Sequence, residues 1–551
     1  LESGAVAPVT GLPPFVITRG GDYFFAPGVK AMREIAHGEK FAVDAPHLPY
    51  EGYSMGDTTT PTLLSEERIK GYAGQIFAGA KDVVRTGVPS PVPGDPGAAP
   101  VAFVARVAHV KQALSMRTDA SNQMITSVAD YQEATRTIST GHDMIVSTQP
   151  DGVTGAKRAL MIKILEAGWA VLSTPQESVY VRLARTTKRS IEATLRRTAS
   201  RRAIDIVHDL GSVTTYNVIG DLFGTPGPDW LTEMAVALRF SRQHLTQIDP
   251  EWLAAIKASK PEDVGLATWQ VWSILMFVDI VGNYLQQEEL KALGVQAGRE
   301  FLTHVDMLIV KARKQPLPPH ANLLAAFVSL EKTFTDPANP NALPVETYYA
   351  LVRMLLLEVA SSAIVIPATV GAVVHTALSA GIDLPSLIQL LLKVTPSQAK
   401  FDEGIDRLLY ETWRLNPTVK LLMRRSNQDE QYGKDMVRKG DWIAALIGAA
   451  CFDPVAFPEP KRFSLDPILP GPRRNLDDYL LFGDAGTTGR LCWGRDKLAR
   501  YLLTECLKAA GRLKGLKKVA GPRGELKKFA QVNVGFPTRF VSVLPDWPKK
   551  P

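Results

Sequence analysis

The chain has few cysteines: only Cys451, Cys492 and Cys506 occur among its 551 residues. So small and odd a set argues against a disulfide framework and for a reducing compartment. No Cys-x-x-Cys motif occurs, and none of the nine histidines forms a zinc-like pair, so a zinc site is not expected. We therefore expect a cytoplasmic protein, either soluble or peripherally associated with a membrane.

No targeting signal is expected within residues 1–30, because they contain no basic segment followed by an apolar one. The chain starts at Leu1, which we interpret as a trimmed end. One long apolar run, residues 355–374, includes Glu358 and Pro367. We predict that this run is a buried core helix and not a membrane span.

The charge pattern of the sequence does not favour nucleic acid as a partner. The net charge of +7 is a mild bias for a chain of this length, compatible with an acidic protein or an anionic membrane surface. Residues 182–210 form a basic amphipathic pattern, but no aromatic residues alternate with the charges to stack on bases. Nucleic acid is therefore not an expected partner, and membrane contact is expected to be peripheral at most.

Helical patterns dominate the rest of the chain. Residues 1–100 are rich in proline and glycine, and residues 101–114 read as a strand followed by a short helix. Mostly helical patterns follow to about residue 415, including a long helix over 346–379, and the chain closes with a helix and a β-like tail. We predict a mainly α fold, with an irregular lead and early strand(s) in 1–100 and one large domain over 101–545.

The stretch "LLFGDAGTTGRLCWGRDKLA", residues 480–499, carries a candidate reactive group. Glycines surround Cys492, and an amphipathic helix begins just after it. A helix N-terminus and the nearby Arg490 both favour the thiolate over the thiol. Such a thiolate can act as a nucleophile or as a metal ligand. No histidine is near in sequence, so an axial ligand to haem iron fits better.

Two further motifs accompany this cysteine. In "ETWR", Glu411 and Arg414 stand three residues apart and can pair on one helix face. In "FDPVAFPEPKRF", residues 452–463, we expect Arg462 to reach back to that pair. With Cys492, these motifs resemble the cytochrome P450 haem-thiolate family, and the resemblance extends over most of residues 100–545. It implies a helical bundle around haem b, with small β-sheets near the N- and C-terminal parts.

The resemblance also implies roles for individual residues. Cys492 would be the axial iron ligand, and Glu411, Arg414 and Arg462 would be structural. The loop from Phe482 to Cys492 is longer than the family's usual spacing. The positions that correspond to haem-binding residues, several of them contacts to the propionates, are Arg490, Arg424, Arg425, Lys157, Arg158 and Phe482.

The helix above the haem departs from the family pattern. The family usually places an acid and a threonine there to relay protons to bound oxygen. The corresponding "EVASSAI", residues 358–364, offers Glu358 as the acid and Ser361 or Ser362 as the alcohol. The pocket is expected to be lipophilic and to accept a fatty acid, terpenoid, steroid or polyketide, with a lining that includes Ala360, Ala363, Ile364 and Val419.

Three functions remain open at this level. The first is a monooxygenase that takes electrons from a ferredoxin- or flavodoxin-type donor docked on Arg495, Lys497 and Arg500, which equally suit a solvated helix. The second is a peroxide-driven peroxygenase or a fatty-acid hydroperoxide-rearranging enzyme, which needs no reductase. The third is a haem-binding protein without activity.

Overall fold

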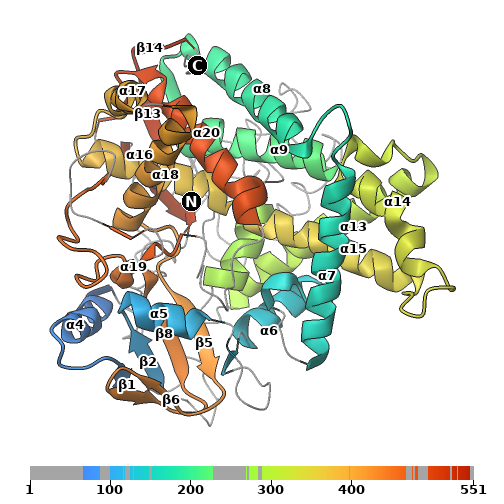
Figure 1. Cartoon of the computed structure of the whole chain (residues 1–551), viewed down its shortest axis with the longest axis horizontal. Helices are drawn as coiled ribbons and strands as arrows, with labels where there is room; N and C mark the ends of the chain where they lie inside the picture. Colours follow the sequence, from blue (N-terminus) through green and yellow to red (C-terminus); the bar gives the residue numbers. More distant parts are fainter. Residues whose placement is uncertain are drawn as a thin grey trace, which may run out of the picture.

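The computed structural model describes residues 66–86, 100–115, 117, 125–127, 129–147, 152–227, 269, 272–282, 288–395, 397–466, 474–475, 478–481, 494–520, 524–529 and 532–545. Helices make up most of this part of the chain, and the strands form small sheets at its borders (Figure 1). Phe482, Arg490 and Cys492 lie outside the described residues.

The largest sheet has the strand order β1-β2-β8-β5-β3. Strand β2 pairs in parallel with β8, and the other neighbours pair antiparallel. An apolar cluster that includes Ile76 and Phe103 joins helix α4 to this sheet. Since β1 and α4 precede residue 100, the predicted division at that residue passes through one sheet and its covering helix. The strands are β1 (Val84–Thr86), β2 (Val101–Val104), β3 (Thr126–Ser127), β5 (Leu422–Ser426) and β8 (Trp442–Ala445).

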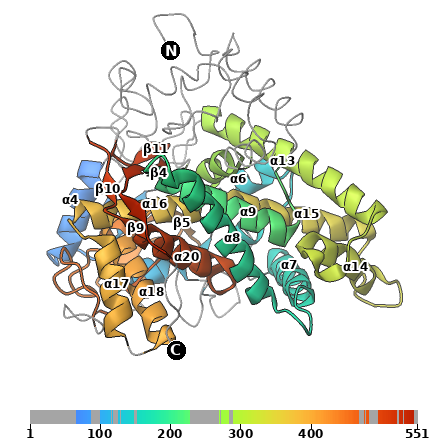
Figure 2. The same ribbon diagram turned by 90° about the horizontal axis from the view of Figure 1, so that it is seen from above.

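The main core lies among the helices. Helix α16 packs against α18 and α20, and α20 lies between α18 and α8 (Figure 1, Figure 2). The described helices include α4 (Glu66–Phe77), α5 (Val107–Leu114), α6 (Ala129–Ile138), α7 (Gly152–Val171), α8 (Val179–Ala199), α9 (Val213–Phe223), α13 (Glu288–Lys314), α14 (Leu323–Thr335), α15 (Val345–Ser362), α16 (Val365–Ser379), α17 (Leu384–Val394), α18 (Gln398–Leu415), α19 (Ile447–Ala450) and α20 (Arg500–Gly511).

Short strands close the remaining borders. A three-stranded sheet has the order β10-β13-β4, and three further pairs are β11 with β12, β14 with β9 and β6 with β7. Their bounds are β4 (Ala203–Asp205), β6 (Glu430–Tyr432), β7 (Asp435–Val437), β9 (Leu513–Lys514), β10 (Lys517–Lys518), β11 (Lys527–Phe529), β12 (Val532–Gly535), β13 (Pro537–Arg539) and β14 (Ser542–Val543).

The long helix predicted over 346–379 is interrupted. Helix α15 ends at Ser362 and α16 begins at Val365. Pro367 has no N–H to donate to the carbonyl of Ala363, and the N–H of Ile366 donates to that oxygen instead, at 3.2 Å. The break therefore comes one turn before the proline, as a tightened turn.

The two helices together, Val345–Ser379, are the one stretch of the described chain that is long and apolar enough to cross a membrane. Within the fold, 67% of the most apolar 18-residue window of this stretch is buried. The neighbours of α16 include α18, α20, strand β12 and the π-helical turn Ile206–Ser212. The stretch thus packs as a core helix, as the sequence predicted.

Candidate functional site

Helix α18 carries the Glu411–Arg414 pair predicted from the sequence. Ser397 caps its start by accepting from the N–H of Lys400, and the helix ends at Leu415, ahead of Pro417. The Nε and Nη2 atoms of Arg414 donate to Glu411 at 2.9 and 2.8 Å, and neither side chain is exposed. A buried ion pair is tolerated when further hydrogen bonds offset its desolvation. Here Nη1 of Arg414 also donates to the carbonyls of Cys451 and Pro460, at 2.7 and 2.6 Å.

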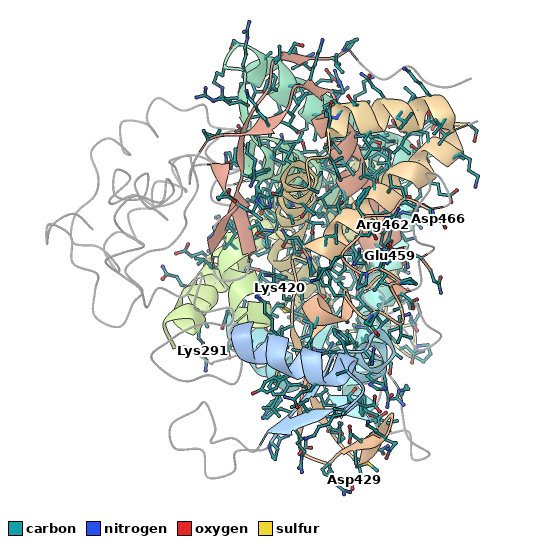
Figure 3. The ribbon with its side chains drawn as sticks, turned by 90° about the vertical axis from the view of Figure 1, so that its left-hand side faces the viewer. Lys291, Lys420, Asp429, Glu459, Arg462 and Asp466 are labelled. Carbon is teal, nitrogen blue, oxygen red and sulfur yellow. The ribbon has the colours of Figure 1, made fainter. Side chains whose placement is uncertain are left out.

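The third member of this cluster is Arg474, and the prediction of Arg462 was wrong. Arg474 Nε lies 3.3 Å from Glu411 Oε1, and its side chain is 2% exposed. The side chain of Arg462 is 59% exposed and pairs with Glu459, beside which Figure 3 shows it. Arg462 contributes only its carbonyl oxygen, which accepts from Arg414 at 3.3 Å and from Arg474 at 2.7 Å. Its backbone is therefore in the cluster while its charge points to solvent.

The Glu411 carboxylate also binds the segment that precedes residues 482–493. The hydroxyl of Tyr479 donates to Glu411 Oε2 at 2.6 Å, and the N–H of Ser464 donates to Oε1 at 3.0 Å. Burial, and then the Glu411 charge, raise the pKa of the Tyr479 phenol, so it stays protonated and keeps donating. The segment that enters residues 482–493 is therefore tied to α18.

Helix α20, which follows residues 482–493, also bonds to α18. Arg500 Nε donates to Asp406 at 3.0 Å, Thr504 donates to the same carboxylate at 3.0 Å, and Lys508 Nζ donates to Asp402 at 2.7 Å. Helix α20 is thereby bonded along α18. The described residues on both sides of 482–493 are thus bonded to one helix, and the ligand role of Cys492 stays a prediction.

Two of the three cations predicted to receive an electron donor are paired within the chain. Arg500 binds Asp406, and Lys497 Nζ lies 3.6 Å from Glu166. Paired cations present a weaker field to an acidic partner than unpaired ones. This face is therefore less suited to a ferredoxin- or flavodoxin-type donor than its sequence indicates.

The predicted distal residues lie at the break between α15 and α16. The hydroxyls of Ser361 and Ser362 both donate to the carbonyl of Glu358, at 3.1 and 2.7 Å. Ser361 is buried and Ser362 is exposed. Since each proton is committed to the helix's own carbonyl, neither hydroxyl is set up here as a proton donor to a bound ligand.

A residue that the sequence did not reveal stabilises this break. The N–H of Ile364 donates to the hydroxyl of Ser273 at 3.0 Å, and both residues are fully buried. Tyr216 neighbours Ser273; burial raises the pKa of the Tyr216 phenol, and Ser273 offsets part of that rise. Ser273 lies 91 positions before Ile364, so no local sequence pattern signals the contact.

The predicted pocket residues belong to one continuous apolar core. Ala360, Ala363 and Ile364 are buried in it, and Val419 packs against it. The hydroxyls of Thr369 and Thr418 lie 3.1 Å apart and join α16 to the segment that carries Val419. The apolar character of this region is thus present, and its role as a substrate pocket stays a prediction.

The structure separates the two candidate arginines on β5. Neighbouring residues of a strand point to opposite faces. Arg424 is buried, while Arg425 is exposed and stacks over the ring of Trp442 with 5.4 Å between guanidinium carbon and ring centroid. Arg424 is therefore the inward-facing cation, and Arg425 belongs to the outer surface of the sheet.

The two predicted haem-binding cations on α7, Lys157 and Arg158, have different partners. Lys157 Nζ lies 3.5 Å from Asp143, whereas Arg158 donates to the carbonyl of Ile145 at 2.6 Å. Burial lowers the pKa of Arg158, and the charge of Glu358 on α15 raises it in part. Arg158 is thus a half-buried cation in electrostatic contact with the distal helix.

These cations allow a test of the haem prediction. Haem carries two propionate carboxylates, which arginine binds well in a partly buried site. Arg424 and Arg158 come from two different elements and supply two such guanidinium groups away from bulk water. Donors of the chemical kind that propionates bind are therefore present, and their contact with haem stays a prediction. Within the described residues, no cluster of three or more His, Cys, Asp or Glu side chains is placed to hold a metal ion.

Comparison with curated proteins finds similarity over part of the chain. Psi-producing oxygenase A of Emericella nidulans is 31% identical over 150 residues, which cover 27% of this chain and 13% of that protein. A bifunctional dioxygenase (DOX)-epoxy alcohol synthase (EAS) of Fusarium oxysporum is 35% identical over 111 residues, or 20% of this chain and 8% of that protein. The matched segment is thus a small part of these relatives. No protein-family model matches the chain.

Comparison with solved structures covers most of the chain. CalO2 aligns with a TM-score of 0.58 at 17% identity, over 89% of this chain and 99% of that one. Cytochrome P450 CYP109Q5 from Chondromyces apiculatus aligns with a TM-score of 0.54 at 14% identity, over 87% and 98%. P450BioI, solved with an acyl carrier protein that bears hexadec-9Z-enoic acid, aligns at 0.53 and 14%, over 86% and 99%. The chain therefore has the cytochrome P450 fold.

Proposed function

We propose that this chain is a haem-thiolate enzyme that rearranges an unsaturated fatty-acid hydroperoxide, without an electron donor. The observation that carries the proposal is the similarity to an oxygenase and to a bifunctional dioxygenase–epoxy alcohol synthase, on a chain with the P450 fold. An epoxy alcohol is an isomer of an unsaturated hydroperoxide, so its formation consumes no external electrons. The monooxygenase predicted first from the sequence is supported less well by these relatives.

Two structural features support this choice. A monooxygenase needs protons delivered to bound oxygen, yet the hydroxyls of Ser361 and Ser362 both donate to their own helix. It also needs a docking face for its donor, yet Lys497 and Arg500 are paired with carboxylates of the same chain. A hydroperoxide brings its own proton and both oxygen atoms, and its rearrangement needs neither feature.

The chain's residues have distinct parts in this proposal. Cys492 would bind the iron of haem b, and thiolate-ligated haem supplies the chemistry that cleaves the O–O bond. Arg424 and Arg158 would hold the propionates. The apolar side chains around the break between α15 and α16 would hold the acyl chain and exclude water. The Glu411 cluster would hold the segment that leads into the cysteine loop against α18.

The overall reaction is balanced within the substrate. The O–O bond of the hydroperoxide breaks, one oxygen remains on its carbon as the alcohol, and the other adds to the double bond as the epoxide. No atom enters from O2 or water, and the product has the mass of the substrate.

The experiment supplies the haem-loaded protein with an 18O2-labelled C18 hydroperoxide under nitrogen, without NAD(P)H. We expect an isomeric product that keeps both labelled oxygens, and the Cys492→Ser variant should form none. Turnover only of the free fatty acid with O2, NADPH and a reductase would establish the monooxygenase instead. Turnover only of the free acid with hydrogen peroxide would establish a peroxygenase, and an intact haem spectrum without any turnover would favour a non-catalytic haem protein.

A further inference from the structure

An unpaired group of cations surrounds the C-terminal strands. Arg202 follows α8, Lys514 ends β9, Lys517 begins β10 and Arg539 ends β13. All four side chains are exposed. Together with Val541 we call them the cationic face. It lies beside α8, next to β4, β9 and β10 (Figure 2).

Strand register brings two of these cations side by side. Lys517 is directly opposite Arg539, and Arg539 is directly opposite Ala203 on β4. Residues opposite each other point to the same face of a sheet, and like charges in that arrangement are destabilising. Thr538, which points to the other face, is 1% exposed. The sheet therefore presents two adjacent positive charges outward.

Among the described residues, no carboxylate pairs with these cations to offset the repulsion. Neighbouring cations have partners: Arg512 pairs with Glu192, and Lys518 pairs with Glu525. By contrast, none of Arg202, Lys514, Lys517 and Arg539 forms an ion pair with any residue in the part of the chain that the structure describes. Four exposed cations without a counter-charge in one small area favour an external anionic surface.

An exposed apolar residue lies among these cations. Val541 is 60% exposed, and its N–H donates to the carbonyl of Lys514 at 2.8 Å. The preceding residue, Phe540, is buried, and its N–H donates to the carbonyl of Arg202 at 3.1 Å. These two bonds fix the backbone of Phe540 and Val541 to the backbone of Arg202 and Lys514, and the Val541 side chain is exposed there.

We propose that the cationic face docks on an anionic membrane surface. An acidic protein would satisfy the charges, but a protruding valine would gain little from a polar carboxylate surface. Lipid headgroups satisfy both, because lysine and arginine reach phosphates through aliphatic stems while the apolar side chain enters the interface. The exposed Arg196 and Arg197, in the last turn of α8, extend the positive field toward this surface.

The test measures partition of the purified chain onto vesicles by flotation. One set of vesicles is phosphatidylcholine alone, and the other contains phosphatidylserine. We expect binding to the phosphatidylserine vesicles that is lost at high salt, because the attraction falls off within a Debye length. The double variant Lys517→Glu with Arg539→Glu should lower the partition coefficient by about 30-fold or more, at about fivefold for each cation removed.

A matched control variant makes the same change in net charge at a different part of the surface. The variant Lys439→Glu with Lys461→Glu reverses two exposed lysines outside the cationic face and should bind nearly as the parent does. Val541→Ser should weaken vesicle binding without changing the charge. Absence of binding to phosphatidylserine vesicles would overturn the proposal, as would equal losses in the two double variants or capture by an acidic ferredoxin in place of vesicles. Haem loading and turnover do not enter these measurements, so a failure here is distinct from a failure of the proposed reaction.

Discussion

Arg474 forms an ion pair with Glu411 across 63 residues of sequence, with Nε 3.3 Å from Oε1 and both side chains almost wholly buried. Glu411 thus pairs with two arginines and accepts from Tyr479 and a backbone N–H at the same time. This one carboxylate connects α18 with the segment that leads into the cysteine loop.

Removal of Arg474 should therefore destabilise the protein more than removal of Arg462. Arg474→Ala takes away one partner of a buried carboxylate and the two hydrogen bonds that Nη2 donates to backbone carbonyls, and we expect a loss of about 3 kcal/mol in the free energy of unfolding. Arg462→Ala breaks only an exposed pair with Glu459 and should cost less than about 0.5 kcal/mol. Urea unfolding of the two variants measures both values, and equal losses would contradict the assignment.

Sequence spacing was sufficient for the helical part of this cluster and insufficient for its loop. Glu411 and Arg414 stand three residues apart on a strongly patterned helix, and helix geometry alone brings them together. Arg462 and Arg474 both lie in irregular backbone, where the direction of a side chain depends on each turn. Turns set by tertiary contacts have no period, so the choice between the two arginines could not be made from the sequence.

The same limit applies to the distal helix and the sheet. An apolar run predicted a buried helix, but the hydroxyl that accepts from the break in this helix comes from a residue 91 positions away. On β5, two adjacent arginines were equally good candidates, because alternation shows only that they differ and not which faces inward. Pairing with β8 decides this, with Arg424 opposite Ile443 and Arg425 opposite Trp442.

Ser273→Ala should leave the break between α15 and α16 without its acceptor. The buried N–H of Ile364 would then be unsatisfied, which costs about 1–3 kcal/mol. Ser361→Ala is the matched control, because that hydroxyl only donates to its own helix and alanine favours helix by about 0.5 kcal/mol. Denaturant unfolding compares the two variants, and faster hydrogen exchange at Ile364 in Ser273→Ala locates the effect. An unchanged midpoint for Ser273→Ala would show that the contact contributes nothing.

Arg424→Ala should reduce haem retention, whereas Arg425→Ala should not. A charge-assisted hydrogen bond to a propionate contributes about 1.5–3 kcal/mol, or about 10- to 100-fold in affinity. The ratio of Soret to protein absorbance after gel filtration reports retention. Arg424→Lys keeps the charge and should recover part of it, which separates haem binding from a general folding defect. Loss in Arg425→Ala alone would reverse the assignment.

The two described thiols should be unreactive in the folded protein. Burial raises the pKa of both Cys451 and Cys506 to about 12. At about pH 8 this lowers the thiolate fraction roughly a thousandfold relative to an exposed cysteine, and the reaction rate should rise about tenfold for each pH unit below the pKa. Haem-free protein should react quickly with iodoacetamide at one thiol, and the Cys492→Ser variant at none until denaturant is added. Fast labelling of folded Cys492→Ser would contradict the burial of these thiols.

Arg202→Gly should strengthen the fold and weaken vesicle binding at once. Arg202 has a φ of 50°, in the left-handed region that costs a side chain about 1–2 kcal/mol and glycine almost nothing. After the greater chain entropy of unfolded glycine is subtracted, we expect a net gain of about 0.5–1 kcal/mol in unfolding free energy. The lost cation should lower partition onto phosphatidylserine vesicles about fivefold.

Arg202→Ala is the control for this prediction. It removes the same charge and keeps the left-handed backbone, so its binding should fall without the gain in stability. Because stability and binding move in opposite directions in Arg202→Gly, partial unfolding cannot explain the loss of binding; a variant that binds as the parent does would remove Arg202 from the cationic face.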